Sequence, residues 1–162
     1  MGGINTMSIE KVRDYFEDLD TDKEILEFDL SSATVELAAV AVGTEEARIA
    51  KTLSFITKKG PILIVTSGDA KVDNKKYKTE FHCKAKMVPF DEAEEIIGHK
   101  VGGICPFAIK ENVEVYLDNS LRRFDTSFPA AGSDNSAIEF TCEELEKYSQ
   151  NFVSWVDVCK IV

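Results

Sequence analysis

The sequence predicts one α/β domain with a mixed β-sheet flanked by helices. Its length of 162 residues suits a single domain that buries roughly 70% of its unfolded surface. Its composition, 44% hydrophobic and 30% charged, is typical of a globular chain rather than a disordered one. Helical and strand patterns alternate without the regular spacing of βαβ units, which favours a mixed sheet over a doubly wound one.

The first fifty residues are mainly helical in pattern. Ser8 stands before apolar residues at helical spacing and is a suitable N-cap, and Ser31 or Ser32 has the same position before a second helix. Gly43 ends that second helix because glycine readily adopts the left-handed conformation that follows a helix. The predicted elements are a helix over 8–19, a strand over 24–29, a helix from 31 or 32 to 42 and a short helix from 44.

From Lys51 the apolar pattern changes from helical to extended. Residues 51–57 and 61–66 are apolar or β-branched, and Lys58-Lys59-Gly60 between them predicts a hairpin. Short strands and helices then alternate to the C-terminus. The predicted strands are 87–88, 113–117, 137–141 and 152–159, and the predicted helices are 72–81, 91–97, 120–124 and 142–149. We treat residues 1–6 as an N-terminal extension and residues 7–162 as the domain.

The formal net charge of −10 argues against a general nucleic-acid binder, and against DNA in particular, because such binding depends on neutralising phosphates. The charge is unevenly distributed along the chain. Residues 51–86 carry nine lysines and three carboxylates, a net charge of +6, whereas the regions on both sides are acidic. This lysine-rich window is either a solvated helix with two turns or a positive footprint for an anionic partner.

Four cysteines, at positions 83, 105, 142 and 159, are widely spaced and form no C-x-x-C pair. This spacing argues against a disulfide framework and favours a reduced, cytoplasmic setting. His82-Cys83 and His99 are too few and too scattered to predict a zinc site. No apolar run reaches the roughly 18 residues of a membrane span, and the N-terminus lacks the pattern of a secretory signal. We therefore expect neither a metal site nor a membrane partner.

The segment Val101-Gly102-Gly103-Ile104-Cys105-Pro106-Phe107-Ala108 is the most informative stretch of the chain. Adjacent glycines leave backbone N–H groups open to a ligand, and the proline biases the residue before it toward an extended conformation. Such a loop can hold several amides in a fixed array, which suits a phosphate or a developing oxyanion. The same pattern fits an ordinary tight turn, so its meaning depends on the rest of the chain.

Three segments, in order, resemble the YbaK/prolyl-tRNA synthetase-associated domain family. Residues 47–55 are similar to the family's I-x-K-T-L segment, residues 102–108 are similar to its G-G-x-S-P-x-G loop, and residues 131–140 look like its late glycine-rich turn and strand. The resemblance covers almost all of residues 7–162. It implies a mixed, partly barrel-like sheet flanked by helices, with a cleft between the three segments. It also implies hydrolysis of mischarged aminoacyl-tRNA without a metal or organic cofactor.

The resemblance implies roles for individual residues. Lys51 matches the family's functional lysine, which would contact the phosphate or ribose of the terminal adenosine or polarise the ester carbonyl. The backbone amides of Gly102 and Gly103 would hold the oxyanion. The residues expected to bind the substrate are Thr52, Ile104, Cys105, Pro106, Gly132, Ser133 and Asp134. The lysines expected to contact the acceptor end of the tRNA are Lys71, Lys75, Lys76 and Lys78.

Three positions depart from the family pattern. Cys105 stands where serine is common, and we expect a small, semi-buried contact rather than a nucleophile because no histidine lies near it in sequence. Ala108 replaces the usual glycine and is expected at negative φ. Ala137 stands where one branch of the family has a functional aspartate, so the substrate preference of that branch does not carry over. Asp134 or Asn135 is a candidate for recognising the amino group instead, although turn chemistry also explains both residues.

The expected function is that of a freestanding aminoacyl-tRNA deacylase acting on a small amino acid such as alanine, serine or cysteine. The alternative, favoured by the three departures, is a non-catalytic module with a degenerate pocket that binds tRNA or a synthetase. A third hypothesis is that the same loop hydrolyses another small ester. The expected partner is the acceptor end of an aminoacyl-tRNA, with an aminoacyl-tRNA synthetase as a second candidate.

Overall fold

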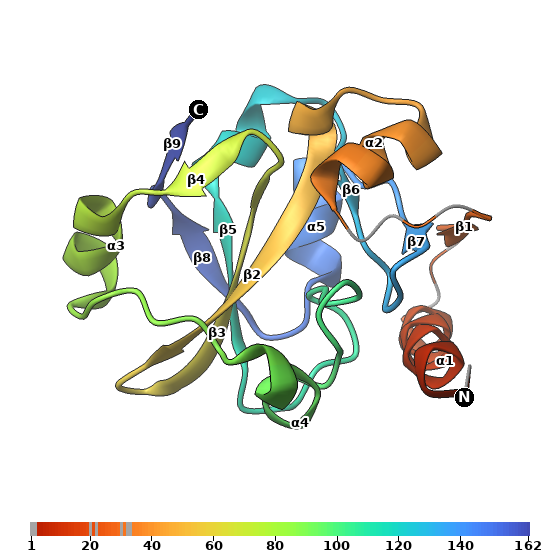
Figure 1. The fold of residues 1–162 in the computed structure, drawn as a ribbon, viewed down its shortest axis with the longest axis horizontal. Helices are drawn as coiled ribbons and strands as arrows, with labels where there is room; N and C mark the ends of the chain where they lie inside the picture. Colours follow the sequence, from red (N-terminus) through yellow and green to blue (C-terminus); the bar gives the residue numbers. More distant parts are fainter. Residues whose placement is uncertain (1–2, 20, 22, 30, 32–33) are drawn as a thin grey trace.

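A mixed sheet of five strands forms the centre of the molecule (Figure 1). The computed structural model describes residues 3–19, 21, 23–29, 31 and 34–162, with the side chains of residues 3–7 left aside. The strands, in spatial order, are β6 (Phe128–Pro129), β2 (Ile49–Thr57), β3 (Gly60–Ser67), β5 (Glu114–Asp118) and β8 (Phe152–Val156). β2 and β3 are antiparallel, and the other three pairs are parallel. The predicted α/β class, with a mixed and partly barrel-like sheet, is confirmed.

Short elements surround this sheet. Two small strand pairs are β1 (Leu26–Glu27) with β7 (Ser136–Ala137), and β4 (Ala70–Val72) with β9 (Cys159–Ile161). The α-helices are α1 (Gly3–Asp18), α2 (Val35–Val42), α3 (Asn74–Phe81), α4 (Ala93–Ile96) and α5 (Cys142–Tyr148). Three 3-10 turns are η1 (Glu46–Arg48), η2 (Phe90–Glu92) and η3 (Asn119–Arg123).

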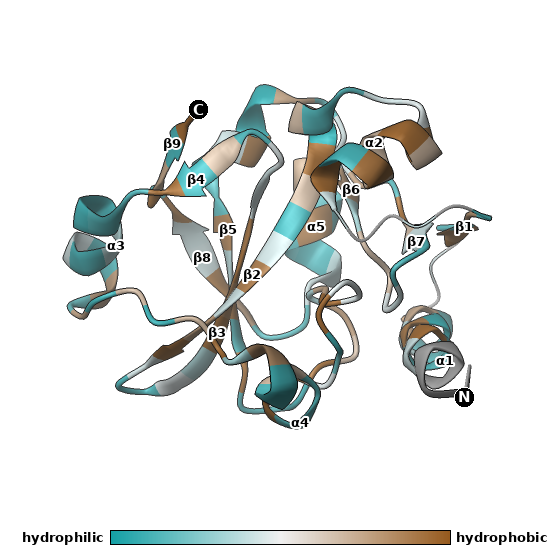
Figure 2. Cartoon of the chain, viewed as in Figure 1, coloured by the Kyte–Doolittle hydropathy of each residue, from teal (hydrophilic) through white to brown (hydrophobic). Residues whose placement is uncertain are grey.

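The predicted hairpin of β2 and β3 is confirmed, and it divides the core into two faces. Residues of a strand alternate between faces, so Leu63 and Val65 point to one side of the sheet while Ile62 and Ile64 point to the other. The first pair packs with α1, α4 and α5, and the second pair packs with α3. Figure 2 shows hydrophobic residues along the central strands and mainly hydrophilic residues over α3. Each face of the sheet is therefore covered by its own layer.

Helix α2 covers the end of β2 next to β6 and β7, through a third cluster that includes Ala38, Ile49 and Phe128. Its N-cap is Thr34, whose hydroxyl accepts the N–H of Leu37, and it ends at Gly43, as predicted. The predicted cap at Ser31 is therefore wrong, and Ser32 lies outside the described residues. This helix and Thr34 form one wall of the cavity described below.

Helix boundaries differ from the prediction where a side chain caps the backbone. The helix predicted over 72–81 begins at Asn74, because Asp73 accepts the N–H groups of Lys75 and Lys76 and Val72 pairs with β9. The strand predicted over 137–141 stops at Ala137. Thr141 instead begins α5 with a reciprocal capping box to Glu144.

Strand lengths also differ. The strand predicted over 152–159 is divided, because the Asp118 carboxylate accepts the N–H of Val158 and the chain turns there from β8 into β9. The strand predicted at 87–88 is reduced to a bridge between Met87 and Phe55. Strand β6 was not predicted because two residues carry no periodic pattern. The first helix begins at Gly3 rather than Ser8.

Candidate functional site

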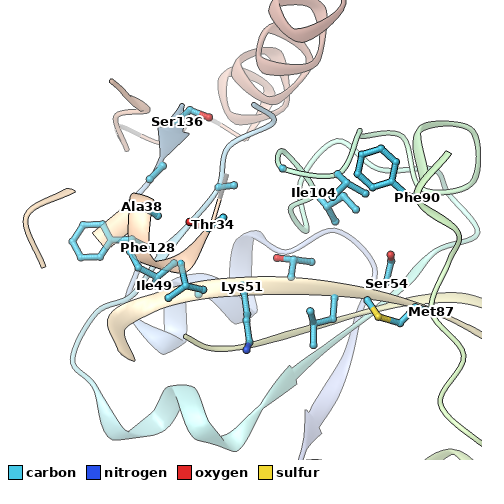
Figure 3. A pocket seen from close by; sticks show the side chains of 18 of the residues that line it. Thr34, Ala38, Ile49, Lys51, Ser54, Met87, Phe90, Ile104, Phe128 and Ser136 are labelled. Atoms are coloured by element: carbon cyan, nitrogen blue, oxygen red, sulfur yellow. The ribbon is translucent and has the colours of Figure 1, made fainter. Parts of the chain in front are cut away.

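A cavity of about 480 Å³ lies between α2, the outer edge of β2 and the glycine loop (Figure 3). Strands β6 and β7 and residues 87–90 complete its wall. A volume of this size holds a drug-sized ligand. The lining is mostly apolar, and its polar side chains are Thr34, Lys51, Thr52, Ser54 and Ser136. The cavity therefore brings together parts of the three segments that carry the sequence resemblance.

The floor of the cavity is an uncovered stretch of the β2 edge. Pairing with β6 ends at Ala50, and the bridge to Met87 begins at Phe55. Ser54 accepts an N–H from Val88 at 3.0 Å on the side of β2 away from β3. Because the direction of backbone groups alternates along an antiparallel pair, the N–H and C=O of Thr52 point to that same open side. The Thr52 hydroxyl is buried and has no hydrogen-bond partner among the described residues.

Lys51 occupies the opposite face of β2 from the glycine loop. Side-chain alternation places it with Leu53 and Phe55, which belong to the core under α3. Figure 3 shows its ammonium on the far side of the β2 ribbon from Ile104 and Ser136. The structure thus brings the stem of Lys51 to the cavity but does not bring its ammonium to the glycine loop.

The glycine loop presents Gly102 and Ile104 to the cavity. Gly102 has a φ of +100°, a conformation that glycine adopts at little cost. Gly103 lies behind it and donates its N–H to Lys100 O at 3.0 Å. In the described structure, neither Gly102 nor Ile104 donates its N–H to another backbone group. The amides that this loop can offer a ligand are therefore those of Gly102 and Ile104, rather than that of Gly103.

Residues 132–134 of the late turn support the loop from behind instead of lining the cavity. A Cβ on Gly103 would lie 2.7 Å from the carbonyl of Gly132, so the two backbones are in direct contact. Gly132, Ser133 and Asp134 line a second, smaller cavity of about 230 Å³ on the other side of the loop. The structure therefore separates these three residues from the main cavity, and Asn135 is held by a hydrogen bond to Phe28 O.

Ala108 has a φ of +55°, so the prediction of a negative φ is wrong. Its neighbours are held on both sides. His99 hydrogen-bonds to Phe107 O, and the Gln150 amide group bonds to both the N–H and the C=O of Ile109. The chain must reverse between these anchors, and the left-handed conformation costs roughly 1–2 kcal/mol for alanine. The loop therefore holds Ala108 in a conformation that glycine would adopt at little cost.

Cys105 is fully buried and, contrary to expectation, lies beside a histidine. Its Sγ is 3.6 Å from His99 Nε2, which is 2.6 Å from Phe107 O. A carbonyl only accepts, so Nε2 carries the proton and Nδ1 accepts the hydroxyl of Ser8 at 2.6 Å. Burial raises the pKa of Cys105 to about 12 and lowers the pKa of His99 to about 4. The uncharged Cys105–His99 pair therefore connects the glycine loop to Ser8 of α1. Pro106 is also buried.

The four predicted tRNA-contacting lysines lie on elements that cover the other face of the sheet. Lys71 is on β4, and Lys75, Lys76 and Lys78 are on α3; all four are exposed. Figure 1 places these elements across β2 from α2 and β7. They share that side of the sheet with Lys51. Lys76 is partly neutralised, because its ammonium is 3.0 Å from Asp157 Oδ1 and donates to Cys159 O.

Several lining residues were not predicted from the sequence. Thr34, Ser54, Met87, Phe90 and Ser136 come from separate segments, and each has an ordinary local role as a cap, strand or turn residue. The spacing of a single sequence carries no sign that they meet. Lys51 is the one ionisable residue in the described lining, so no carboxylate, cysteine or histidine faces the cavity.

The described residues show neither a metal-binding cluster nor a membrane-spanning helix. In the described part of the chain, no group of three or more His, Cys, Asp or Glu side chains is placed to hold a metal ion. All four cysteines are free. Among the helices of the described residues, none is long and apolar enough to cross a membrane.

Comparisons with known proteins connect this geometry to a family. The sequence profile of the aminoacyl-tRNA editing domain matches residues 31–148. YwhH of Bacillus subtilis (strain 168) is 50% identical over 155 residues, which are 95% of this chain and 98% of YwhH. A protein of Enterococcus faecalis (strain ATCC 700802 / V583), provisionally named Cys-tRNA(Pro)/Cys-tRNA(Cys) deacylase EbsC, is 29% identical over 114 residues, 69% of this chain and 70% of that protein.

The fold has similar solved structures as well. One crystal structure, described provisionally as a trans-editing enzyme for prolyl tRNA synthetase, superposes with a TM-score of 0.83 at 25% identity. The match covers 94% of this chain and 97% of that one. The range matched by the family's sequence profile, residues 31–148, includes β2, the glycine loop and the late turn.

Proposed function

This chain belongs to the aminoacyl-tRNA editing domain family, and from that premise we propose that it hydrolyses the ester of a tRNA mischarged with a small amino acid. In the reaction, water adds to the ester carbonyl carbon, the bond from that carbon to the ribose oxygen breaks, and the ribose oxygen takes up a proton. The observation that carries the proposal is the cavity in which Gly102 and Ile104 face the open edge of β2.

The amides of Gly102 and Ile104 are the donors proposed for the oxyanion. A tetrahedral intermediate places negative charge on the former carbonyl oxygen, and fixed N–H groups stabilise that charge without reorganising. The loop is held rigidly from behind by the contact of Gly103 with Gly132 and by the His99 hydrogen bond to Phe107 O. This support keeps the donors in place during the reaction.

The attacking group is proposed to be a water molecule activated by the substrate itself. The described lining offers no side chain that acts as a base near neutral pH, because Lys51 is its one ionisable residue and points across the strand. The neighbouring ribose hydroxyl and the free amino group of the aminoacyl moiety lie within reach of the ester carbonyl in any aminoacyl-tRNA. Either of these groups can take the proton from water.

The proposed preference for small amino acids follows from the α2 end of the cavity. Ala38, Ala130, Ser136 and Ala137 line that end, so a short aminoacyl side chain fits beside them. Such a pocket excludes larger side chains by overlap but discriminates weakly among small ones. We therefore propose alanine, serine or cysteine as the class, without a single preferred residue.

Lys51 is proposed to bind a phosphate of the RNA at the point where the RNA strand crosses the edge of β2. The aminoacyl end would then lie on the glycine-loop side, and the RNA backbone would continue toward Lys71, Lys75 and Lys78. An acidic protein that binds only the end of a tRNA needs few such contacts, so the net charge of −10 is compatible with this role.

The proposal is tested with a panel of mischarged tRNAs assayed on the wild type and on Lys51→Ala. The wild type is expected to deacylate tRNAs carrying small amino acids. Lys51→Ala is expected to raise KM roughly 10- to 100-fold with a smaller change in kcat, because one charged phosphate contact is lost. Lys59→Ala, an exposed lysine in the β2–β3 turn, is the matched control and should behave as the wild type.

Two results would count against this assignment. An unchanged KM in Lys51→Ala would show that this lysine does not bind the substrate. Binding of aminoacyl-tRNA without turnover by the wild type would support the non-catalytic module instead of a deacylase.

Cys105→Ser is expected to keep kcat/KM within about threefold of the wild type. The thiol is buried, protonated and directed at His99 and Phe107 O rather than at the cavity, and a serine hydroxyl can donate to the same carbonyl. The measurement is deacylation of the preferred substrate, together with iodoacetamide labelling of the native wild type, which should spare Cys105. Loss of all activity in the variant would assign a chemical role to the thiol.

A further inference from the structure

Phe90 is the one exposed aromatic side chain among the described residues, with 76% of its surface accessible. It lies on the rim of the main cavity, at the opposite end from Phe128 and Ala38 (Figure 3). Met87 and Val101, also exposed, line the same cavity. Exposed apolar groups gathered at a cavity mouth mark a binding surface rather than an accident of packing.

The position of Phe90 is set by the pairing of residues 86–88 with β2. Ile56 donates its N–H to Lys86 O at 2.8 Å, and Val88 donates to Ser54 O at 3.0 Å. Continuing this antiparallel register by two residues would place Phe90 opposite Thr52. The pairing stops first, because the chain leaves the extended conformation after Pro89 and Phe90 begins η2. The aromatic ring is therefore held next to the part of the β2 edge that no strand covers.

That part of the edge offers hydrogen-bonding groups of both kinds. The N–H and C=O of Thr52 point outward into the cavity, and the Thr52 hydroxyl is buried without a partner in the described structure. Buried polar groups are normally paired in native proteins. An unpaired donor, acceptor and hydroxyl in a cavity whose rim carries an exposed aromatic ring indicate a planar ligand with polar groups along one edge.

Resting on the proposed deacylase function, we propose that the terminal adenine of the tRNA stacks on Phe90 and is read along one edge by the backbone of Thr52. Adenine presents an amino donor beside a ring-nitrogen acceptor, which matches a strand that offers a C=O and an N–H. Stacking on an aromatic side chain is a common means of binding an unpaired base. The hydroxyl of Thr52, which has no partner in the described structure, would pair with the ribose. The cavity volume of about 480 Å³ suits a nucleoside with a small aminoacyl group.

This assignment explains how one site serves several tRNAs. Every aminoacyl-tRNA ends in adenosine, so a site that reads this base positions the ester against Gly102 and Ile104 whatever the rest of the tRNA. Phe90 and Thr52 are then binding residues that place the reacting ester, and the small residues at the α2 end select the amino acid.

The test combines variants with a non-hydrolysable ligand. Phe90→Ala is expected to raise KM for aminoacyl-tRNA roughly tenfold with little change in kcat, whereas Phe90→Tyr should stay close to the wild type because it keeps a stacking ring. Val153→Ala, an exposed apolar residue on β8, is the matched control. In calorimetry, 3′-deoxy-3′-(alanylamino)adenosine should bind the wild type at least tenfold more tightly than its inosine counterpart, which has a carbonyl in place of the amino donor.

The outcomes separate this inference from the proposed function. If the wild type deacylates tRNA but Phe90→Ala matches it in KM, and the two nucleosides bind equally, the adenine site is overturned and the deacylase stands. If the adenosine ligand binds with the expected preference but no aminoacyl-tRNA is hydrolysed, the adenine site stands and the deacylase fails. Unchanged kinetics in Phe90→Ala together with altered binding to a synthetase would make Phe90 a protein contact and also overturn the inference.

Discussion

Gly103→Ala is expected to lower deacylation at least 100-fold and to lower the free energy of unfolding by about 1–3 kcal/mol. The new Cβ would lie 2.7 Å from the C and O atoms of Gly132 and 2.8 Å from the N of Ser133. These are backbone atoms, so no change of rotamer relieves the overlap. Gly132 has no room to retreat, because its own Cβ position is 2.8 Å from Ser8 O. The loop must therefore move toward the cavity and displace Gly102 and Ile104.

The measurements are single-turnover deacylation and urea unfolding. Gly60→Ala is the control, because Gly60 has a φ of +122° in the hairpin turn but nothing within 4 Å of its Cβ position. That variant should lose about 1 kcal/mol of stability through backbone strain and keep its activity. A Gly103→Ala protein with the wild-type rate would show that this loop does not hold the reacting centre.

The free energy of unfolding is expected to fall by about 3 kcal/mol between pH 7 and pH 4 because of His99. Burial lowers the pKa of His99 to about 4 in the folded protein, against about 6.5 in an unfolded chain. Below pH 6.5 the unfolded chain therefore gains a proton that the folded protein does not take up, and stability falls with pH. Below pH 4 both states are protonated and this contribution stops growing.

Other titrating groups act in a different range. The pKa of Asp69 is lowered by its hydrogen bond with Arg123, so its contribution is lost below about pH 4 rather than above it. The change in the free energy of unfolding between pH 6.5 and pH 4 is thus due mainly to His99. Urea unfolding at several pH values measures the slope, and a wild type equally stable at pH 7 and pH 5 would contradict the assignment.

Two variants identify the histidine responsible. His99→Gln removes the titrating group, so its stability curve should be flatter between pH 6.5 and pH 4 whatever its absolute stability. The control is His82→Asn at the exposed end of α3, where asparagine tolerates the φ of +58°. A slope that His99→Gln loses and His82→Asn retains is assigned to His99.

The parts of the fold that could be predicted depend on local pattern. The hairpin of β2 and β3 was predictable because apolar or β-branched residues flank a Lys-Lys-Gly turn. The end of α2 was predictable because Gly43 takes a left-handed conformation there. Helix starts were less predictable. The Asp73 cap begins α3 at Asn74 rather than at the predicted Val72, and the Thr141 cap begins α5 where a strand was predicted to end.

The candidate site was predictable only as a set of segments. The resemblance located β2, the glycine loop and the late turn, and the cavity joins parts of all three. It did not separate residues that line the cavity, such as Thr52 and Ile104, from those that support it, such as Gly103 and Gly132. That division depends on which backbone lies in front of which, and the close backbone contacts at the Gly103 Cβ position are with Gly132 and Ser133, far along the chain.

The sequence by itself determined the fold class, the family and the glycine loop, because composition, local periodicity and short motifs are properties of neighbouring residues. Only the tertiary structure decided that Lys51 points away from the loop and that His99 links Cys105 and Phe107 O to Ser8. It also decided that Thr52 has an open edge in the cavity whose lining includes Phe90. These features follow from strand register, from the two-residue length of β6 and from the early end of pairing at Pro89. Each depends on contacts between distant segments, which the spacing of a single sequence does not encode.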